Sequence, residues 1–174
     1  MTGAVTTSLT FRQASPADAE AIGELFVIAG RTGWADFLSH DQLEQIQGQP
    51  DKWLERIGNP FNPDIVLAED DDGLAGFIWV HQCGDLDLTE PTGEVGTFYT
   101  HPRVWGSGVG RLLMERGLDR LRSLGYTECV LWTEERNERP RRIYEQMGWA
   151  LDGTTRVRDY QGLAITEVRH RYRL

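Results

Sequence analysis

Three glycines stand at alternate positions past the middle of the chain, in the run Trp105-Gly106-Ser107-Gly108-Val109-Gly110, and a helix pattern follows them directly. The start of a helix leaves several backbone N–H groups unpaired and carries partial positive charge, so such a turn can hold an anion such as a phosphate. The alternative is a plain tight turn that packs a helix against a strand. Three glycines in register between a strand and a long helix favour phosphate binding.

The glycine run matches neither of the common nucleotide motifs. A P-loop ends in Gly-Lys-Ser/Thr, but the one lysine of this chain, Lys52, lies elsewhere. The dinucleotide fingerprint has the spacing G-x-G-x-x-G near the start of its βαβ unit, whereas this chain has G-x-G-x-G past its middle.

The run is instead similar to the acetyl-CoA loop of the GNAT N-acetyltransferase superfamily, whose signature is Gln/Arg-x-x-Gly-x-Gly/Ala after a strand. Gly108 and Gly110 match both glycine positions, and Trp105 stands where the family has Gln or Arg. This departure removes one side chain that could reach a pyrophosphate. Backbone amides would therefore carry more of the binding.

A second segment, Asn137–Trp149, resembles the family's Asn-x-x-Ala-x-x-x-Tyr-x-x-x-Gly-Phe pattern, with Pro140 in place of Ala and Trp149 in place of Phe. Together the two motifs span Glu94–Trp149, about a third of the chain. The resemblance implies acetyl-CoA as co-substrate and no metal.

The resemblance also places the coenzyme. The pantetheine arm would pair with the backbone of one strand, and the pyrophosphate would meet the glycine turn. Asn137 has two interpretations, the N-cap of the following helix or a contact to the pantetheine amides. The implied coenzyme-binding residues are Phe98, Tyr99, Thr100, Gly106, Ser107, Gly108, Val109, Gly110, Arg111 and Asn137.

Acetyl transfer to an amine needs a base for the amine and an acid for the leaving thiolate. The resemblance assigns the acid to Tyr144, which otherwise would be a core tyrosine of its helix. Glu94 is the first candidate for the base, because it alternates with Phe98 and Thr100 along its strand; the alternative is a solvent-facing glutamate. Glu134 is the second candidate.

We therefore expect an N-acetyltransferase that transfers an acetyl group directly to a primary amine, with a small molecule favoured over a protein as acceptor. Trp34, Phe37, Trp79 and His81 are candidates for the acceptor pocket. The alternatives are a catalytically silent acyl-CoA-binding or sensor module, and a generic nucleotide-phosphate binder. The sequence does not identify the acceptor.

These residues need a scaffold, and the hydrophobic pattern supplies one. It predicts a strand, helices, three strands, a helix, a strand, a helix and two strands, which is an α+β fold with a mixed sheet flanked by helices. The first helix should end at Gly30. In the helix after the glycines, Val109, Leu112, Leu113, Leu121 and Leu124 fall on one face. The family resemblance adds a central parallel strand pair that splays apart, and Gly96 is a candidate bulge.

Composition limits the remaining choices. The 174 residues, 40% of them hydrophobic, suit a single domain over residues 9–174, after a disordered stretch Met1–Ser8. A net charge of −9 argues against nucleic-acid binding, and no apolar run suits a membrane span. Cys83 and Cys129 are expected as reduced thiols in a cytoplasmic protein. The acidic Gly84–Gly93 loop is either solvated or a rim that attracts amines, and a homodimer through the last strands remains open.

Overall fold

The computed structural model describes residues 8–59, 64–88 and 90–174. The predicted disorder of Met1–Ser8 therefore concerns residues that, except for Ser8, lie outside the described part. The strands are β1 (Thr10–Gln13), β2 (Ile65–Asp70), β3 (Gly73–Gln82), β4 (Gly93–Thr100), β5 (Glu128–Glu134), β6 (Ala150–Tyr160) and β7 (Leu163–Arg173). The α-helices are α1 (Ala19–Gly33), α2 (His40–Glu44), α3 (Pro50–Gly58), α4 (Val109–Ser123) and α5 (Glu138–Gln146), and short 3-10 turns cover Pro16–Asp18 and Pro102–Val104.

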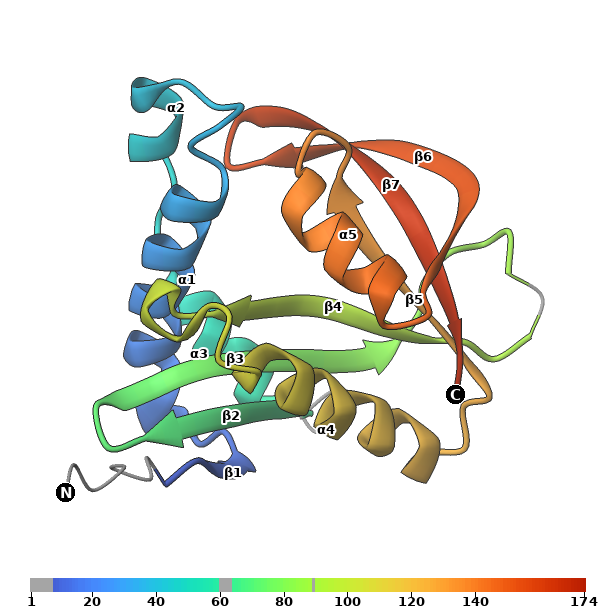
Figure 1. The fold of residues 1–174 in the computed structure, drawn as a ribbon, viewed down its shortest axis with the longest axis horizontal. Coiled ribbons are helices and arrows are strands. Elements are labelled where there is room, and N and C mark those ends of the chain that lie inside the picture. The colour runs from blue at the N-terminus through green and yellow to red at the C-terminus, as the bar shows by residue number, and fades with distance from the viewer. Residues whose placement is uncertain (1–7, 60–63, 89) are drawn as a thin grey trace, which may run out of the picture.

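The seven strands form one mixed sheet in the order β1-β2-β3-β4-β5-β7-β6 (Figure 1). Its central pair, β4 and β5, is parallel, and the pairing covers only three positions, from Gly93 opposite Cys129 to Val95 opposite Leu131. Beyond Val95 the two strands separate in the described structure. The predicted fold class, a mixed sheet flanked by helices with a splayed parallel pair, is confirmed.

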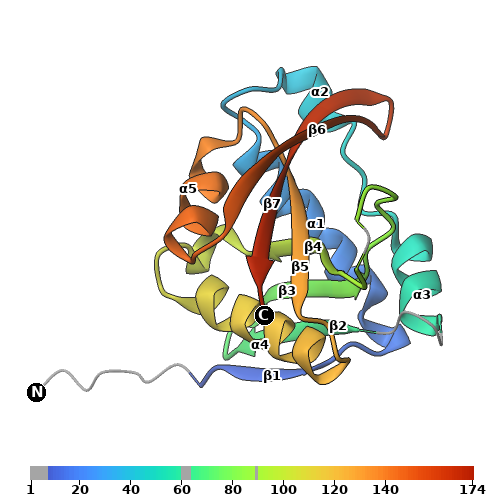
Figure 2. The same ribbon diagram turned by 90° about the vertical axis from the view of Figure 1, so that its right-hand side faces the viewer.

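Helices cover both faces of the sheet (Figure 2). One cluster of buried side chains joins α1 and α3 to β2 and β3, with Ile22, Phe26 and Phe77 among its members. The other joins α4 and α5 to the opposite face and includes Leu113 and Leu121. The splayed β4–β5 pair lies between these two layers, so an opening there connects one face of the sheet with the other.

Helix α4 buries a stripe that is shifted around the helix axis from the predicted one, because Met114 and Leu118 are buried and Leu112 and Leu124 are not. Leu112 and Leu124 are 47% and 44% exposed, whereas Leu113, Met114 and Leu121 are fully buried. The stripe is centred on Gly117, where an added Cβ would lie 2.5 Å from Cδ1 of Ile78. The glycine thus allows the helix to approach β3 closely, which holds the start of α4 against the sheet.

Helix α1 continues beyond Gly30, where its end was predicted, to Gly33. Gly30 is buried against Ile46, so tertiary packing keeps this glycine helical. Trp34 follows the helix and is buried, with its ring 4.9 Å from that of Tyr160. The end of α1 therefore forms one wall of the interior near the β6–β7 hairpin.

Strand β4 contains the predicted bulge at Gly96. Trp79 of β3 lies opposite Thr97, but the next residue of β3, Val80, lies opposite Val95, so Gly96 is an extra residue on β4. A Cβ at this position would lie 2.2 Å from Nε2 of the His81 ring, which stacks on Trp79. The bulge also changes which way the flanking side chains point.

Candidate active site

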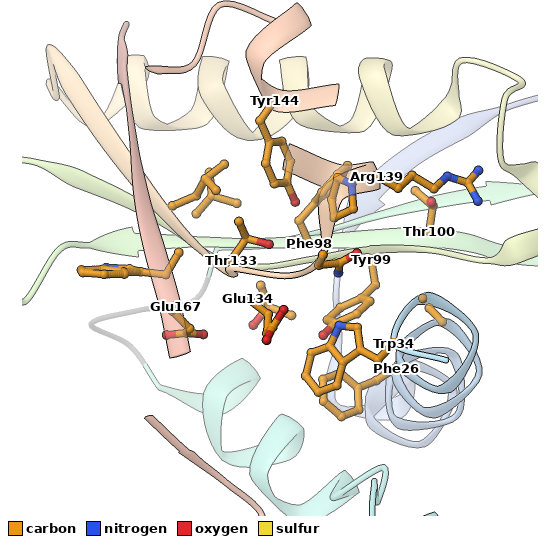
Figure 3. Close-up of a pocket in the computed structure, with 18 of the residues that line it drawn as sticks. Phe26, Trp34, Phe98, Tyr99, Thr100, Thr133, Glu134, Arg139, Tyr144 and Glu167 are labelled. Carbon is orange, nitrogen blue, oxygen red and sulfur yellow. The ribbon is translucent and has the colours of Figure 1, made fainter. Parts of the chain in front are cut away.

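A cavity of about 1220 Å³ fills the opening between β4 and β5 and is lined by residues from both faces of the sheet. Figure 3 shows Tyr144 on one side of the strands and Glu134, Glu167 and Trp34 on the other. The cavity therefore has two compartments that meet at the splayed strands. One contains the glycine turn and α5, and the other lies between α1, α3 and the β6–β7 hairpin.

The glycine turn has the backbone that its sequence requires. Gly106 and Gly108 have φ angles of 83° and 91°, a left-handed conformation that other residues adopt at a cost. Gly108 is the N-cap of α4, so the N–H groups of Gly110 and Arg111 lie in a first turn that offers them no helical acceptor. All four residues line the cavity. This places unpaired donors at the positive end of a 15-residue helix.

Trp105 has a structural role that the sequence did not reveal. Its indole Nε1–H donates to the carbonyl oxygen of Thr100 at 3.0 Å, which ties the turn to the end of β4. The guanidinium of Arg139, from α5, lies over the indole with Cζ 4.2 Å from the ring centroid. Arg139 thus brings a cation to the position where the family pattern has Gln or Arg.

The end of β4 has a free edge toward the cavity. Phe98, Tyr99 and Thr100 pair with β3 on one side, and beyond Val95 the described part of β5 does not pair with them. The Phe98 side chain joins the α4 cluster, whereas Tyr99 points to the opposite face, with its ring 5.1 Å from that of Phe26. The backbone of these residues is therefore available to an extended ligand, and Tyr99 anchors the strand in the core.

Asn137 does not act as a side-chain cap. It precedes α5 as predicted, but its side chain makes no capping hydrogen bond. Its φ and ψ of −79° and 72° differ from the extended conformation in which an N-cap side chain reaches back to the helix. Asn137 lines the cavity instead, so its side-chain amide is available to a ligand.

Tyr144 combines the two interpretations given by the sequence. Its ring is packed in the core, 5.7 Å from the ring of His170 and 6.4 Å from that of Phe98. Its hydroxyl points into the opening between the strands (Figure 3). Burial, with a smaller contribution from Tyr99, raises the pKa of Tyr144. The hydroxyl therefore keeps its proton near neutral pH and can donate it.

Several carboxylates line the cavity, among them Glu94, Glu134 and Glu167 in the compartment on the α1 side. Glu134 accepts two hydrogen bonds from Arg136, from its backbone N–H and its Nε, both at 2.6 Å. Glu167, the cross-strand partner of Glu134, accepts one from Arg156 at 2.7 Å. Glu94 has no ion-pair or hydrogen-bond partner for its carboxylate among the described residues. Of the two predicted bases, Glu134 is bound to Arg136, whereas the carboxylate oxygens of Glu94 accept no hydrogen bond within the described structure.

The orientation of Glu94 differs from the predicted alternation. Val95 and Phe98 both join the α4 cluster although three residues separate them, because Gly96 inserts an extra position. Glu94 therefore points to the face of Tyr99, opposite to Phe98 and Thr100. The sequence wrongly placed these three on one face. The prediction assumed strict alternation of side chains along the strand, and a one-residue bulge cannot be recognised from that pattern.

The acidic loop before β4 is neither free in solvent nor a rim for amines at Asp85 and Asp87. Both carboxylates bind the guanidinium of Arg169, which is 2% exposed, at 2.9 and 2.6 Å. Asp152 of β6 completes the set at 2.7 Å. This network fastens the loop to β6 and β7.

Among the described residues, no group of three His, Cys, Asp or Glu side chains is arranged to hold a metal ion, and no helix is long and apolar enough to cross a bilayer.

The fold and the cavity together define a class. A parallel pair that opens beside a glycine turn and a helix start, with a protonated tyrosine facing the opening, is the arrangement of an acyltransferase domain.

Comparison with known proteins identifies the family. The model of the Acetyltransferase (GNAT) family matches residues 33–149, and the chain belongs to this family, as the sequence predicts. A mycothiol acetyltransferase of Nocardiopsis dassonvillei is 36% identical over 117 residues, which cover 64% of this chain and 36% of that protein. Another, of Geodermatophilus obscurus, is 40% identical over 129 residues, covering 68% and 39%. The chain thus spans little more than a third of the length of these curated relatives.

Solved structures share the fold of this chain. A GCN5-related N-acetyltransferase from Rhodopseudomonas palustris superposes with a TM-score of 0.77 at 18% identity, covering 99% of this chain and 100% of the other. The PaiA N-acetyltransferase of Thermoplasma acidophilum, solved in complex with coenzyme A, gives 0.71 at 19% identity, covering 95% and 99%. At these identities the comparison establishes the fold.

Proposed function

We propose that this chain is an acetyl-CoA-dependent N-acetyltransferase that transfers the acetyl group directly to a primary amine of a small molecule. The observation that carries the proposal is the opening of β4 from β5 directly beside the glycine turn. An extended pantetheine arm can add to the free edge of Phe98–Thr100, while its diphosphate meets the N–H groups of Gly106–Arg111. The Asn137 amide is within the same compartment and is assigned to the arm.

The two compartments suit a direct transfer. The amine nitrogen enters from the α1 side and attacks the thioester carbonyl, so that an N–C bond forms and the C–S bond breaks. Glu94 takes the proton that the amine loses, and its uncommitted carboxylate supports this role. The Tyr144 hydroxyl, on the other side of the strands, protonates the leaving thiolate. Backbone N–H groups of the β4 edge would stabilise the oxyanion.

A small acceptor is favoured over a protein. The compartment on the α1 side lies between side chains of α1, α3 and the β6–β7 hairpin, a setting that suits a small acceptor. The matched relatives are named for mycothiol, a small molecule.

The rival function is a silent acyl-CoA sensor on the same fold. The experiment that separates the two is release of free thiol from acetyl-CoA, measured with a panel of primary amines and with calorimetric binding of acetyl-CoA in parallel. An enzyme binds acetyl-CoA and releases thiol in proportion to the acetylated amine. Binding without amine-dependent release would establish the sensor, and preferential binding of ATP or NAD would contradict both.

A further inference from the structure

A second cavity of about 510 Å³, between α3, β3, β4 and β6, shares most of its lining residues with the large cavity and forms the mouth of the α1-side compartment. Glu94 lies in its wall, so this mouth leads to the proposed base. Three arginines line it, Arg56, Arg156 and Arg158, together with the stacked rings of Trp79 and His81. Two carboxylates, Glu94 and Asp159, line the same cavity, so its arginines outnumber its acids by one in a chain whose net charge is −9.

Arg56 has no carboxylate partner. Its guanidinium carbon lies 4.7 Å from the Trp53 ring centroid and 4.4 Å from that of Trp79, and no acidic side chain of the described residues lies within ion-pair distance. None of residues 1–7, 60–63 and 89 is an acid. Both indoles lie against the guanidinium, and within the described structure its N–H groups donate no hydrogen bond to another side chain or to the backbone.

Arg158 lines the same cavity, and its nearest carboxylate, Glu167, is bound more closely by another arginine. Its Nη1 is 4.0 Å from Oε1 of Glu167, whereas Arg156 holds the other oxygen of that carboxylate at 2.7 Å. Arg56 and Arg158 line the same cavity, and burial, followed by the charge of Arg158, lowers the pKa of Arg56. Asp159 accepts a hydrogen bond from the Gly162 N–H in the hairpin turn and makes no ion pair with either arginine in the described structure.

We propose that the acceptor is a primary amine that also carries a carboxylate, as a free amino acid does, and that Arg56 and Arg158 bind this carboxylate in the mouth. The planar guanidinium fork fits a carboxylate with two parallel hydrogen bonds. The same molecule would direct its amine toward Glu94, which lines the same cavity. A zwitterion is neutral overall, so it reaches the mouth without being repelled by an acidic protein.

This inference rests on the proposed function and is tested with matched acceptors. Tyrosine and tyramine, tryptophan and tryptamine, and phenylalanine and phenethylamine differ only in the carboxylate, and the amino-acid amides keep the size without the charge. We expect kcat/KM for each amino acid to exceed that of its decarboxylated and amide partners at least about tenfold, since a hydrogen bond to a charged group contributes that much or more.

The arginines are tested by Arg56→Gln and Arg158→Gln. Each should lower kcat/KM for amino acids about tenfold or more, mainly through KM, and leave the decarboxylated amines and the KM of acetyl-CoA within about twofold. Arg122→Gln is the matched control, because Arg122 lies on α4 away from the cavity and pairs with Asp119. Arg158, 45% exposed, can be replaced with little effect on folding if Arg56→Gln proves unstable.

Equal kcat/KM for amino acids and their decarboxylated partners would overturn the carboxylate site while leaving the acetyltransferase intact. Equal losses for both kinds of acceptor in the arginine variants would do the same. If no acceptor releases thiol, the proposed function fails by itself. Calorimetric titration of the same amino acids into the protein with coenzyme A then decides the site: binding that Arg56→Gln abolishes supports it, and absence of binding overturns it.

Discussion

The guanidinium carbon of Arg139 lies 4.2 Å from the centroid of the Trp105 indole, so a residue of α5 is held over the turn that begins α4. In the family pattern the position of Trp105 carries a polar or cationic side chain. Here the two properties are divided between two residues. Trp105 fixes the turn through its bond to Thr100, and Arg139 provides the charge.

Arg139→Gln should weaken acetyl-CoA binding about three- to thirtyfold with little change in kcat, because a cation near the diphosphate contributes to coenzyme affinity rather than to the chemical step. Calorimetry with coenzyme A measures the change. Arg116→Gln is the control, since Arg116 also stacks on an aromatic ring, Phe11, but lies outside the cavity. Equal affinity of the Arg139 and Arg116 variants would remove Arg139 from the coenzyme site.

Tyr144→Phe should lower kcat about a hundredfold or more and leave coenzyme affinity nearly unchanged. The substitution removes the only group proposed to protonate the thiolate, while the ring that packs against Phe98 and His170 remains. The melting temperature should stay close to that of the parent, since no hydrogen bond to the hydroxyl is lost within the described structure. Unchanged turnover would show that the thiolate takes its proton from solvent.

Glu94→Gln and Glu134→Gln should have opposite effects. The first should lower kcat/KM about a hundredfold or more near neutral pH, because it removes the proposed base. The second breaks the charge-assisted bonds to Arg136 and should lower the melting temperature while kcat is largely retained. Steady-state kinetics and thermal unfolding of both variants decide the assignment. The reverse pattern would give the role of base to Glu134.

The free energy of unfolding should fall as the pH is lowered from about 7 to 5. His170 is fully buried with neither ring nitrogen hydrogen-bonded in the described structure, and burial, followed by the charge of Arg141, lowers its pKa. The unfolded chain therefore binds a proton below about pH 6.5 that the folded chain resists, at up to about 1.4 kcal/mol per pH unit. Glu145 and Asp152 oppose this shift only in part.

Denaturant unfolding of His170→Gln across this pH range tests the assignment, and the variant should show a flatter profile than the parent. His40→Gln should keep the parent's slope, since the His40 side chain is 84% exposed. His101, whose pKa is also lowered by burial, contributes equally to both proteins. A parent profile that is already flat between pH 7 and 5 would contradict the role of His170.

The features that follow from local pattern were predictable. The order of the elements, the glycine turn and the placement of Tyr144 on its helix are encoded within short stretches, and the family motif adds the splayed pair. Features that depend on distant residues were not. Asp85 and Asp87 of the loop are bound by Arg169, which lies more than 80 residues later, and no periodicity connects them. Arg56 and Arg158 likewise line one cavity only because β6 folds beside α3.

Gly96 shows that the side of the sheet on which a strand places its side chains depends on the number of residues in the strand. One inserted position turns the Glu94 side chain from the face of Phe98 and α4 to the face of Tyr99 and α1, while leaving the rest of β4 in register with β3. A substitution at a neighbouring site alters one side chain, but a deletion here would exchange the two sides of the strand and send the carboxylate into the layer under α4. The face of the sheet on which the Glu94 carboxylate lies thus depends on the length of this segment as much as on its composition.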